Sequence, residues 1–168
     1  FMNYFLDLGE LEGELLRTDA NPVEPINGSV FQLALAQRLT LRVTMPETPG
    51  VFPLLALGER SNLRCGVVLR SNPSLGLPDL APQTDQWTGA LDFTQDKKLR
   101  AQKPLALRSA DNTISIALTG PAPKYTWGLN DRFYPYRDPY WVERGQRVEM
   151  VITNPTPMGH PMHLHGHE

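Results

Sequence analysis

The last nine residues read His160-Pro161-Met162-His163-Leu164-His165-Gly166-His167-Glu168, and all four histidines of the chain lie among them. Neutral imidazole is the commonest side-chain metal ligand, and it suits copper, zinc, iron and nickel. In an extended segment side chains alternate between two faces at about 3.3 Å per residue. His163 and His165 are therefore expected to project to the same side, roughly 6.6 Å apart along the chain. The pattern predicts a metal site but does not choose among these metals.

The residues between the histidines add detail to this prediction. Leu164 faces away from the two flanking imidazoles and can pack, and Pro161 restricts His160 to β or polyproline geometry, which sets its imidazole apart from the pair. A histidine-rich terminus can also be a purification tag, an adventitious metal binder or a solvated tail. The interleaved proline, methionine, leucine and glycine argue against a tag. A simple divalent-metal-binding tail predicts that substitution of its histidines leaves folding untouched.

Together with the residues before it, this stretch resembles the first C-terminal copper motif of the multicopper oxidases, the laccase-like blue copper enzymes. The approach to the histidines, Val142-Glu-Arg-Gly-Gln-Arg-Val-Glu-Met-Val-Ile-Thr-Asn154, is similar as well. The resemblance implies that His160 binds the type 1 (blue) copper, His163 the type 2 copper and His165 one of the paired type 3 coppers. His167 is not a direct ligand in that motif, and it is left as a candidate neighbour of the ligands.

The resemblance also implies the fold, an all-β, cupredoxin-like Greek-key β-sandwich present as parts of two consecutive domains. Residues 1–70 are expected to form the C-terminal part of a middle cupredoxin-like domain, and residues 71–86 a linker. Residues 87–168 would then be the N-terminal part of the copper-binding C-terminal cupredoxin domain. Asp19-Ala-Asn-Pro-Val-Glu-Pro25 supports the first assignment, with Ala20 standing where the family usually has glycine.

The residue patterns themselves favour strands. Sixteen prolines and thirteen glycines, spread along the chain, suit many short strands and turns. Gly9 to Thr18 is predicted as strand-turn-strand, because two glycines would break so short a helix. Further strand segments are predicted at Phe31–Leu33, Arg38–Val43, Phe52–Leu57, Asn62–Arg70, Ile114–Leu118 and Tyr125–Asn130, with two more strand signals in Val142–Thr153 around Arg144-Gly145.

Three other features are expected to serve the fold rather than binding or catalysis: the cysteine, a short basic run and a group of aromatic residues. Cys65 lies within a predicted strand and is expected to be a small buried residue rather than a thiolate ligand or a nucleophile. The basic residues of 97–100 are expected on a solvated face. Core and turn packing is the default for the aromatic group Phe133, Tyr134, Tyr136, Tyr140 and Trp141.

Composition limits the function further. In 168 residues, 40% hydrophobic and 20% charged content is typical of a globular protein, and the net charge of −2 gives no reason to expect nucleic acid or an acidic membrane as partner. No apolar run is long enough to span a bilayer. A single cysteine excludes an intrachain disulfide. The N-terminus shows no secretion signal, whereas the family resemblance implies an extracytoplasmic (periplasmic or secreted) protein.

The function implied by the resemblance is that of a copper-dependent oxidoreductase with type 1, type 2 and type 3 copper sites. It would couple one-electron oxidation of a small reducing substrate, phenolic or a metal ion, to the four-electron reduction of oxygen to water. The family's His-Cys-His stretch and its first-domain His-x-His pairs are absent from the sequence. The segment alone is therefore expected to be inactive, with its missing strands supplied by the rest of a parent chain or by another copy.

One alternative belongs to a different functional class. A cupredoxin-like structural or assembly protein would keep the fold and lack redox activity. The intact histidines at 160, 163 and 165 argue against it, because such a protein has no need of copper ligands. Whether a His-Cys-His stretch is present in the complete gene would discriminate between the two.

Overall fold

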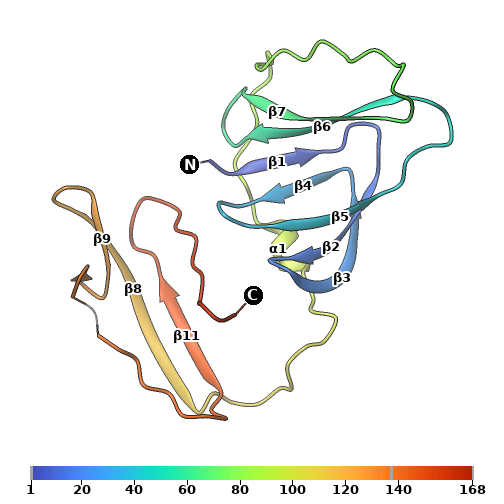
Figure 1. Cartoon of the computed structure of the whole chain (residues 1–168). Helices are drawn as coiled ribbons and strands as arrows, with labels where there is room; N and C mark the ends of the chain where they lie inside the picture. The colour runs from blue at the N-terminus through green and yellow to red at the C-terminus, as the bar shows by residue number, and fades with distance from the viewer. Residues whose placement is uncertain (1, 137, 168) are drawn as a thin grey trace. The chain divides into compact units, whose positions relative to one another are not determined.

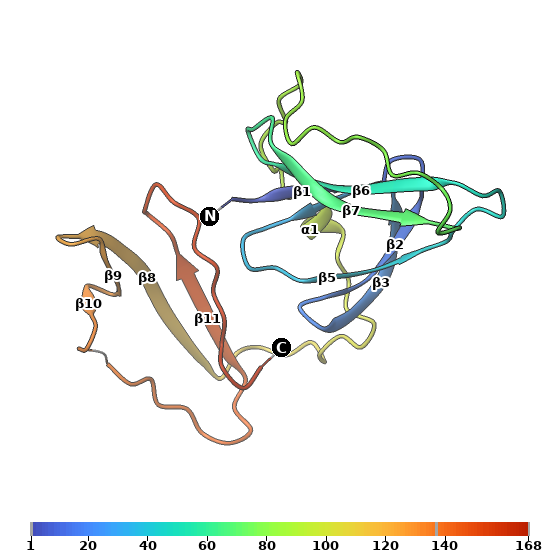
Figure 2. The ribbon, with the colours of Figure 1, turned by 45° about the horizontal axis from the view of Figure 1, so that its top comes forward.

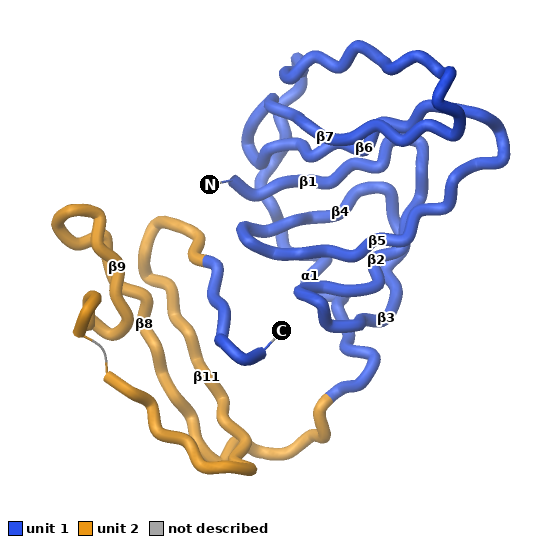
Figure 3. Tube along the Cα trace, in the orientation of Figure 1, with its two compact units in different colours: residues 1–104, 161–168 blue, residues 105–160 orange. Residues whose placement is uncertain are grey.

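The structure is a computed structural model of the chain and describes residues 2–136 and 138–167. Within these ranges the regular structure is nearly all strand, and the single helix is α1 (Thr94–Lys98). No helix in the described part of the chain is long and apolar enough to cross a membrane. The chain divides into two compact units, residues 1–104 with 161–168 and residues 105–160 (Figure 3).

The first unit contains two antiparallel sheets (Figure 1, Figure 2). One has the strand order β4-β1-β6-β7 and the other the order β3-β2-β5. The strands of the larger sheet are β1 (Tyr4–Asp7), β4 (Val30–Leu33), β6 (Val51–Gly58) and β7 (Arg64–Arg70). Those of the smaller sheet are β2 (Gly13–Thr18), β3 (Asn21–Gly28) and β5 (Leu39–Val43). Gly9 to Thr18 forms no helix, as expected, but the range holds a turn and the single strand β2 rather than two strands.

Apolar side chains from both sheets form the core of this unit. Leu15 of β2 and Val23 of β3 belong to the same buried cluster as Phe31 of β4 and Phe52 of β6. Leu15 is fully buried, with 0% of its surface exposed. The alternation of side chains along each strand turns one face of each sheet toward this cluster. The two sheets thus pack as the layers of a β-sandwich.

The predicted linker 71–86 contains no strand, yet it hydrogen-bonds to the first unit. The Arg64 amide donates to Pro82 O at 2.9 Å, and the Thr84 amide donates to Asn62 O at 3.0 Å. Farther along, the side chain of Gln95 in α1 bonds both backbone groups of Gln32, at 2.9 and 2.8 Å. These bonds tie the segment up to residue 104 to the first unit, and the two units separate between residues 104 and 105.

The second unit has one sheet with the order β10-β9-β8-β11. Its strands are β8 (Asn112–Ala122), β9 (Thr126–Leu129), β10 (Arg132–Phe133) and β11 (Val148–Thr153). The first three pair antiparallel, whereas β11 runs parallel to β8. Alternate residues of β8, Ile114, Ile116 and Leu118, form a small buried cluster against Val148. The strands predicted at Ile114–Leu118 and within Tyr125–Asn130 are confirmed.

Three sequence predictions are wrong. Cys65 does lie in a strand, but its side chain is exposed. β7 is an edge strand of its sheet, and the neighbouring residues Gly66 and Val67 are exposed as well. Only one strand forms in Val142–Thr153, since a turn closed by a bond from the Gln146 amide to Glu143 O, with Gly145 at φ +89°, precedes β11.

The third error concerns the core packing expected of the aromatic group, although Tyr134 and Tyr136 do lie at a turn, closed by a bond from the Tyr136 amide to Phe133 O at 2.8 Å. Its members are mostly exposed, up to 86% for Tyr134 and 84% for Trp141, because the segment after β10 runs irregularly outside the small core of the second unit. Phe133 alone among the five is half-buried.

Candidate metal centre

A short loop connects β11 to the first histidine of the motif. It is closed by Asn154, whose side-chain nitrogen donates to Met158 O at 2.7 Å and whose side-chain oxygen accepts from the Thr156 amide at 3.0 Å. An asparagine that bonds the backbone two and four residues on is a common way to fix such a turn. The chain thus enters the histidine segment from a closed loop.

His160 is held on two sides. Its Nε2 lies 2.7 Å from Thr156 Oγ1, and its ring centre lies 4.5 Å from that of Trp127 in β9, with 67° between the planes. Thr156 and His160 are both half-buried, whereas the other residues of 154–160 are exposed. Trp127 in turn meets Tyr125 edge-on at 5.4 Å. One hydrogen bond and one edge-to-face contact therefore restrict the imidazole.

His163 and His165 form a pair. Their ring centres lie 5.1 Å apart with 72° between the planes, and both side chains are exposed. A bond from the His167 amide to Leu164 O, at 3.1 Å, closes the following turn, in which Gly166 takes φ +86°. At this separation both imidazoles can approach one metal ion, or each can hold one ion of a cluster.

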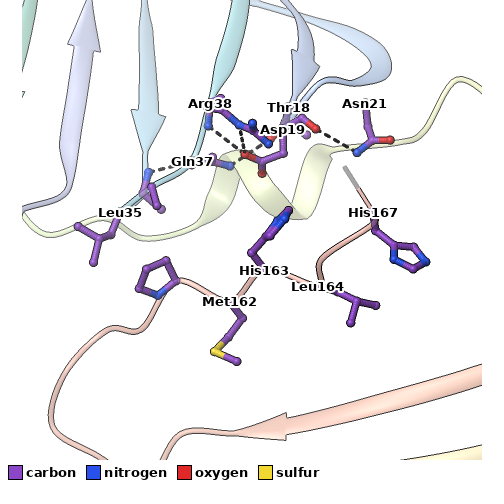
Figure 4. Close-up of a pocket in the computed structure, with 13 residues that line it drawn as sticks. Thr18, Asp19, Asn21, Leu35, Gln37, Arg38, Met162, His163, Leu164 and His167 are labelled. Atoms are coloured by element: carbon purple, nitrogen blue, oxygen red, sulfur yellow. Dashed lines mark hydrogen bonds and ion pairs between the residues drawn. The ribbon is translucent and has the colours of Figure 1, made fainter. Parts of the chain in front are cut away.

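His163 also lines an open cavity of about 770 Å³ in the first unit (Figure 4). Its imidazole points toward the turn that carries Asp19, whereas Met162 and Leu164 point the other way. On that turn Asp19 forms an ion pair with Arg38 at 3.6 Å; the Arg38 side chain is exposed and that of Asp19 is half-buried. The opposite orientation of His163 and Leu164 agrees with the alternation expected from the sequence.

The donor set fits copper in kind but not in number. Across residues 2–136 and 138–167, no three histidine, cysteine, aspartate or glutamate side chains come together as a metal site. Imidazole suits copper, but a blue copper site also needs a thiolate. Cys65, the one thiol of the chain, lies on β7 of the first unit. The assignment of His160, His163 and His165 as copper ligands therefore stays a prediction.

Two residues of this region were not singled out from the sequence. Thr156 contacts His160 only because Asn154 closes the loop, and Trp127 reaches it only through the pairing of β8 with β9. The one sequence signal that could have pointed to Thr156 is a hydroxyl four residues before a histidine, just after an Asn-Pro turn.

Comparison with known proteins gives consistent matches. A sequence model described as multicopper oxidase matches residues 108–168. The multicopper oxidase MmcO of Mycobacterium tuberculosis is 32% identical over 153 residues, which are 89% of this chain and 29% of that protein. Copper resistance protein A of Escherichia coli is 35% identical over 71 residues, which are 42% of this chain and 12% of that protein. The chain thus spans less than a third of the length of either relative.

A solved structure shows the same fold. The crystal structure of Fet3p, a multicopper oxidase that functions in iron import, superposes with a TM-score of 0.60 over 81% of this chain and 28% of that one, at 17% identity. At that identity the match speaks for the fold alone. The all-β, cupredoxin-like class expected from the sequence is confirmed.

Proposed function

We propose that this chain, which belongs to the multicopper oxidase family, supplies three copper-binding imidazoles, His160, His163 and His165, to a copper-dependent oxidoreductase. The observation that carries the proposal is the imidazole pair of His163 and His165, whose ring centres lie 5.1 Å apart in a segment that folds back in a tight turn. Two exposed imidazoles at this distance can both present a ring nitrogen to a metal ion, and imidazole suits copper.

The three histidines take different roles in this proposal. By the family resemblance His160 would bind the type 1 copper, and its imidazole is half-buried and held by Thr156 and Trp127. His163 would bind the type 2 copper and His165 one of the type 3 coppers. Pro161 keeps the first imidazole apart from the other two by restricting the backbone of His160. Bound copper supplies the one-electron redox chemistry, and the protein fixes its geometry and tunes its potential.

The activity proposed for the whole protein is laccase-like. A small reducing substrate, phenolic or a metal ion, loses one electron at a time, and four such electrons with four protons convert one oxygen molecule to two waters. This chain spans 29% of the length of the relative MmcO, so we assign the reaction to the whole protein and expect the segment alone to be inactive. By the same family relationship we propose an extracytoplasmic location.

The second unit is proposed to need further strands. β11 pairs with β8, which carries the small core of the second unit, yet Val151 and Ile152 of β11 are 44% and 39% exposed. Apolar strand residues of this kind are normally covered in a β-sandwich. We propose that other strands of the parent chain or of another copy cover them. Neither nucleic acid nor a membrane is proposed as a partner.

The test uses the full-length copper-loaded protein that carries this sequence. His163→Ala and His165→Ala should each lower the copper content and abolish oxygen uptake, and His160→Ala should remove the blue copper absorption. His167→Ala, a histidine of the same exposed segment that the family motif does not use as a direct ligand, should keep the full copper content. Undiminished copper and oxygen uptake in the first two variants would refute the assignment. Copper binding without oxygen uptake in the unaltered protein would favour a structural or assembly role.

A further inference from the structure

The loop of residues 154–160 contains a chain of hydrogen bonds whose directions follow from chemistry. A backbone carbonyl can only accept, so the side-chain atom of Asn154 that lies 2.7 Å from Met158 O must be its NH₂ group. The amide oxygen of Asn154 then faces Thr156, where it accepts from the backbone amide at 3.0 Å and from the hydroxyl at 2.6 Å. The orientation of the Asn154 amide is thereby fixed twice over.

This orientation decides the state of the next group. The Thr156 hydroxyl has one proton and lies 2.6 Å from Asn154 Oδ1 and 3.3 Å from Met158 O. The shorter contact requires the proton, because two oxygen atoms at 2.6 Å would otherwise repel. Thr156 Oγ1 must therefore accept from His160 Nε2, 2.7 Å away. His160 is thus a donor at Nε2 and, as a neutral imidazole, carries its free lone pair on Nδ1.

We propose that Asn154 and Thr156 are positioning residues that fix His160 as its Nε2–H tautomer and so present Nδ1 to the metal. The inference rests on the proposed role of His160 as a copper ligand and adds the device that orients it. Hydrogen bonds of this kind to the second nitrogen of a ligating histidine fix the ring orientation and raise ligand basicity. The uncharged threonine hydroxyl provides the bond without adding a charge beside the copper.

The surroundings of the contact support this role. Thr156 and His160 are half-buried, so water competes less for their hydrogen bond than it does for the exposed side chain of Asn154. The indole of Trp127 lies 4.5 Å from the imidazole and opposes rotation of the ring away from Thr156. The hydrogen bond sets the tautomer, and the aromatic contact restricts the ring plane.

The test compares Thr156→Val, which removes the hydroxyl but keeps the shape, with Thr156→Ser, which keeps the hydroxyl. In the full-length copper-loaded protein, Thr156→Val should weaken copper binding at the blue site by about 10- to 100-fold in competition with a chelator. It should also change the absorption and electron paramagnetic resonance spectra of that site. Thr156→Ser should bind copper with nearly unaltered affinity and give the unaltered spectra. Identical affinity and spectra in Thr156→Val and the unaltered protein would overturn the proposal.

A second measurement needs neither copper nor a Thr156 variant. Nitrogen-15 resonances of labelled histidine in the metal-free, full-length protein, with His160 assigned by its loss in His160→Gln, should show a protonated Nε2 and an unprotonated Nδ1. A protonated Nδ1 would overturn the inference even if Thr156→Val failed to fold. A failure of the proposed function would give a different result. The unaltered protein would then show no blue copper signal, or the signal would survive in His160→Gln.

Discussion

The imidazole of His160 stands edge-on to the indole of Trp127, with 4.5 Å between ring centres and 67° between the planes. The two residues are 33 positions apart and meet because β9 folds back on β8, while β11 runs parallel to β8 and delivers the histidine loop to the same unit. The first candidate ligand is thus attached to the only sheet of the second unit seen in the described residues.

This contact should be measurable as a coupling energy. Edge-to-face aromatic pairs contribute about 0.5–1.5 kcal/mol beyond the area that they bury. A double-mutant cycle with Trp127→Leu and His160→Gln should therefore give a coupling of about 1 kcal/mol in the free energy of unfolding of the metal-free protein, followed by circular dichroism in denaturant. Strictly additive effects of the two substitutions would show that the rings do not interact.

Leu15 should be a sensitive position of the first unit. It is fully buried in the cluster that joins the two sheets, so Leu15→Ala removes apolar contacts and leaves a cavity. We expect a loss of about 2–5 kcal/mol in the free energy of unfolding. Leu77→Ala, the same change at a side chain that is 64% exposed, should stay within about 0.5 kcal/mol. Equal effects at the two positions would contradict the assigned core.

Gly66 allows the close approach of β7 to β6. A Cβ at this position would lie 2.0 Å from the carbonyl oxygen of Leu54, which is backbone and cannot move aside without disturbing the strand pairing. Gly66→Ala should therefore destabilise the first unit by about 1–3 kcal/mol or more, measured by denaturant unfolding. Gly76→Ala is the matched control, because an added Cβ there meets nothing within 4 Å. An unaffected Gly66→Ala protein would refute the close pairing.

The sequence predicted strands best where apolar residues recur within a short run. The predictions at Arg38–Val43 and Phe52–Leu57 agree with β5 and β6 to within one residue at each end. Among the strands that the sequence pattern does not predict, β3 contains Pro22 and Pro25, which normally argue against a strand. It is tolerated because β3 lies at the edge of its sheet, where its outer side carries an isolated bridge from Val23 to Ala101 in place of a full strand partner. Helix α1 has five residues, too few to show a helical period.

For the candidate metal site, the sequence predicted the candidate ligands but not the residues that orient them. The histidine spacing named the candidate ligands, because all four histidines of the chain lie in one short segment. The groups that orient them were not predictable, since Trp127 and Thr156 act through strand pairing and loop closure that only the folded chain shows. The exposure of Cys65 was missed because the strand pattern around it does not tell an outer strand from a central one.

Asp92 should contribute to the acid sensitivity of the first unit. Its carboxylate accepts from the Gln32 side chain at 2.5 Å and from the amide and hydroxyl of Thr94 at 3.0 and 2.8 Å. These bonds, that from Gln32 first, lower the pKa of Asp92 from the ordinary 3.8 to about 2. Because the folded-state pKa lies below the unfolded one, the ionised carboxylate stabilises the fold fully above pH 3.8, and this contribution disappears as the pH falls toward 2.

Asp92→Asn cannot gain a proton in this range, so it should lower stability at neutral pH and flatten the dependence of unfolding free energy on pH between 4 and 2. The measurement is a series of denaturant unfolding curves across that range. Asp79→Asn, the same change at another exposed aspartate, controls for the loss of one carboxylate from the net charge. If both variants and the unaltered protein lose stability with the same slope, the hydrogen bonds from Gln32 and Thr94 do not favour the charged form. The link that ties β4 to the segment before α1 would then be shown to be independent of the charge on Asp92.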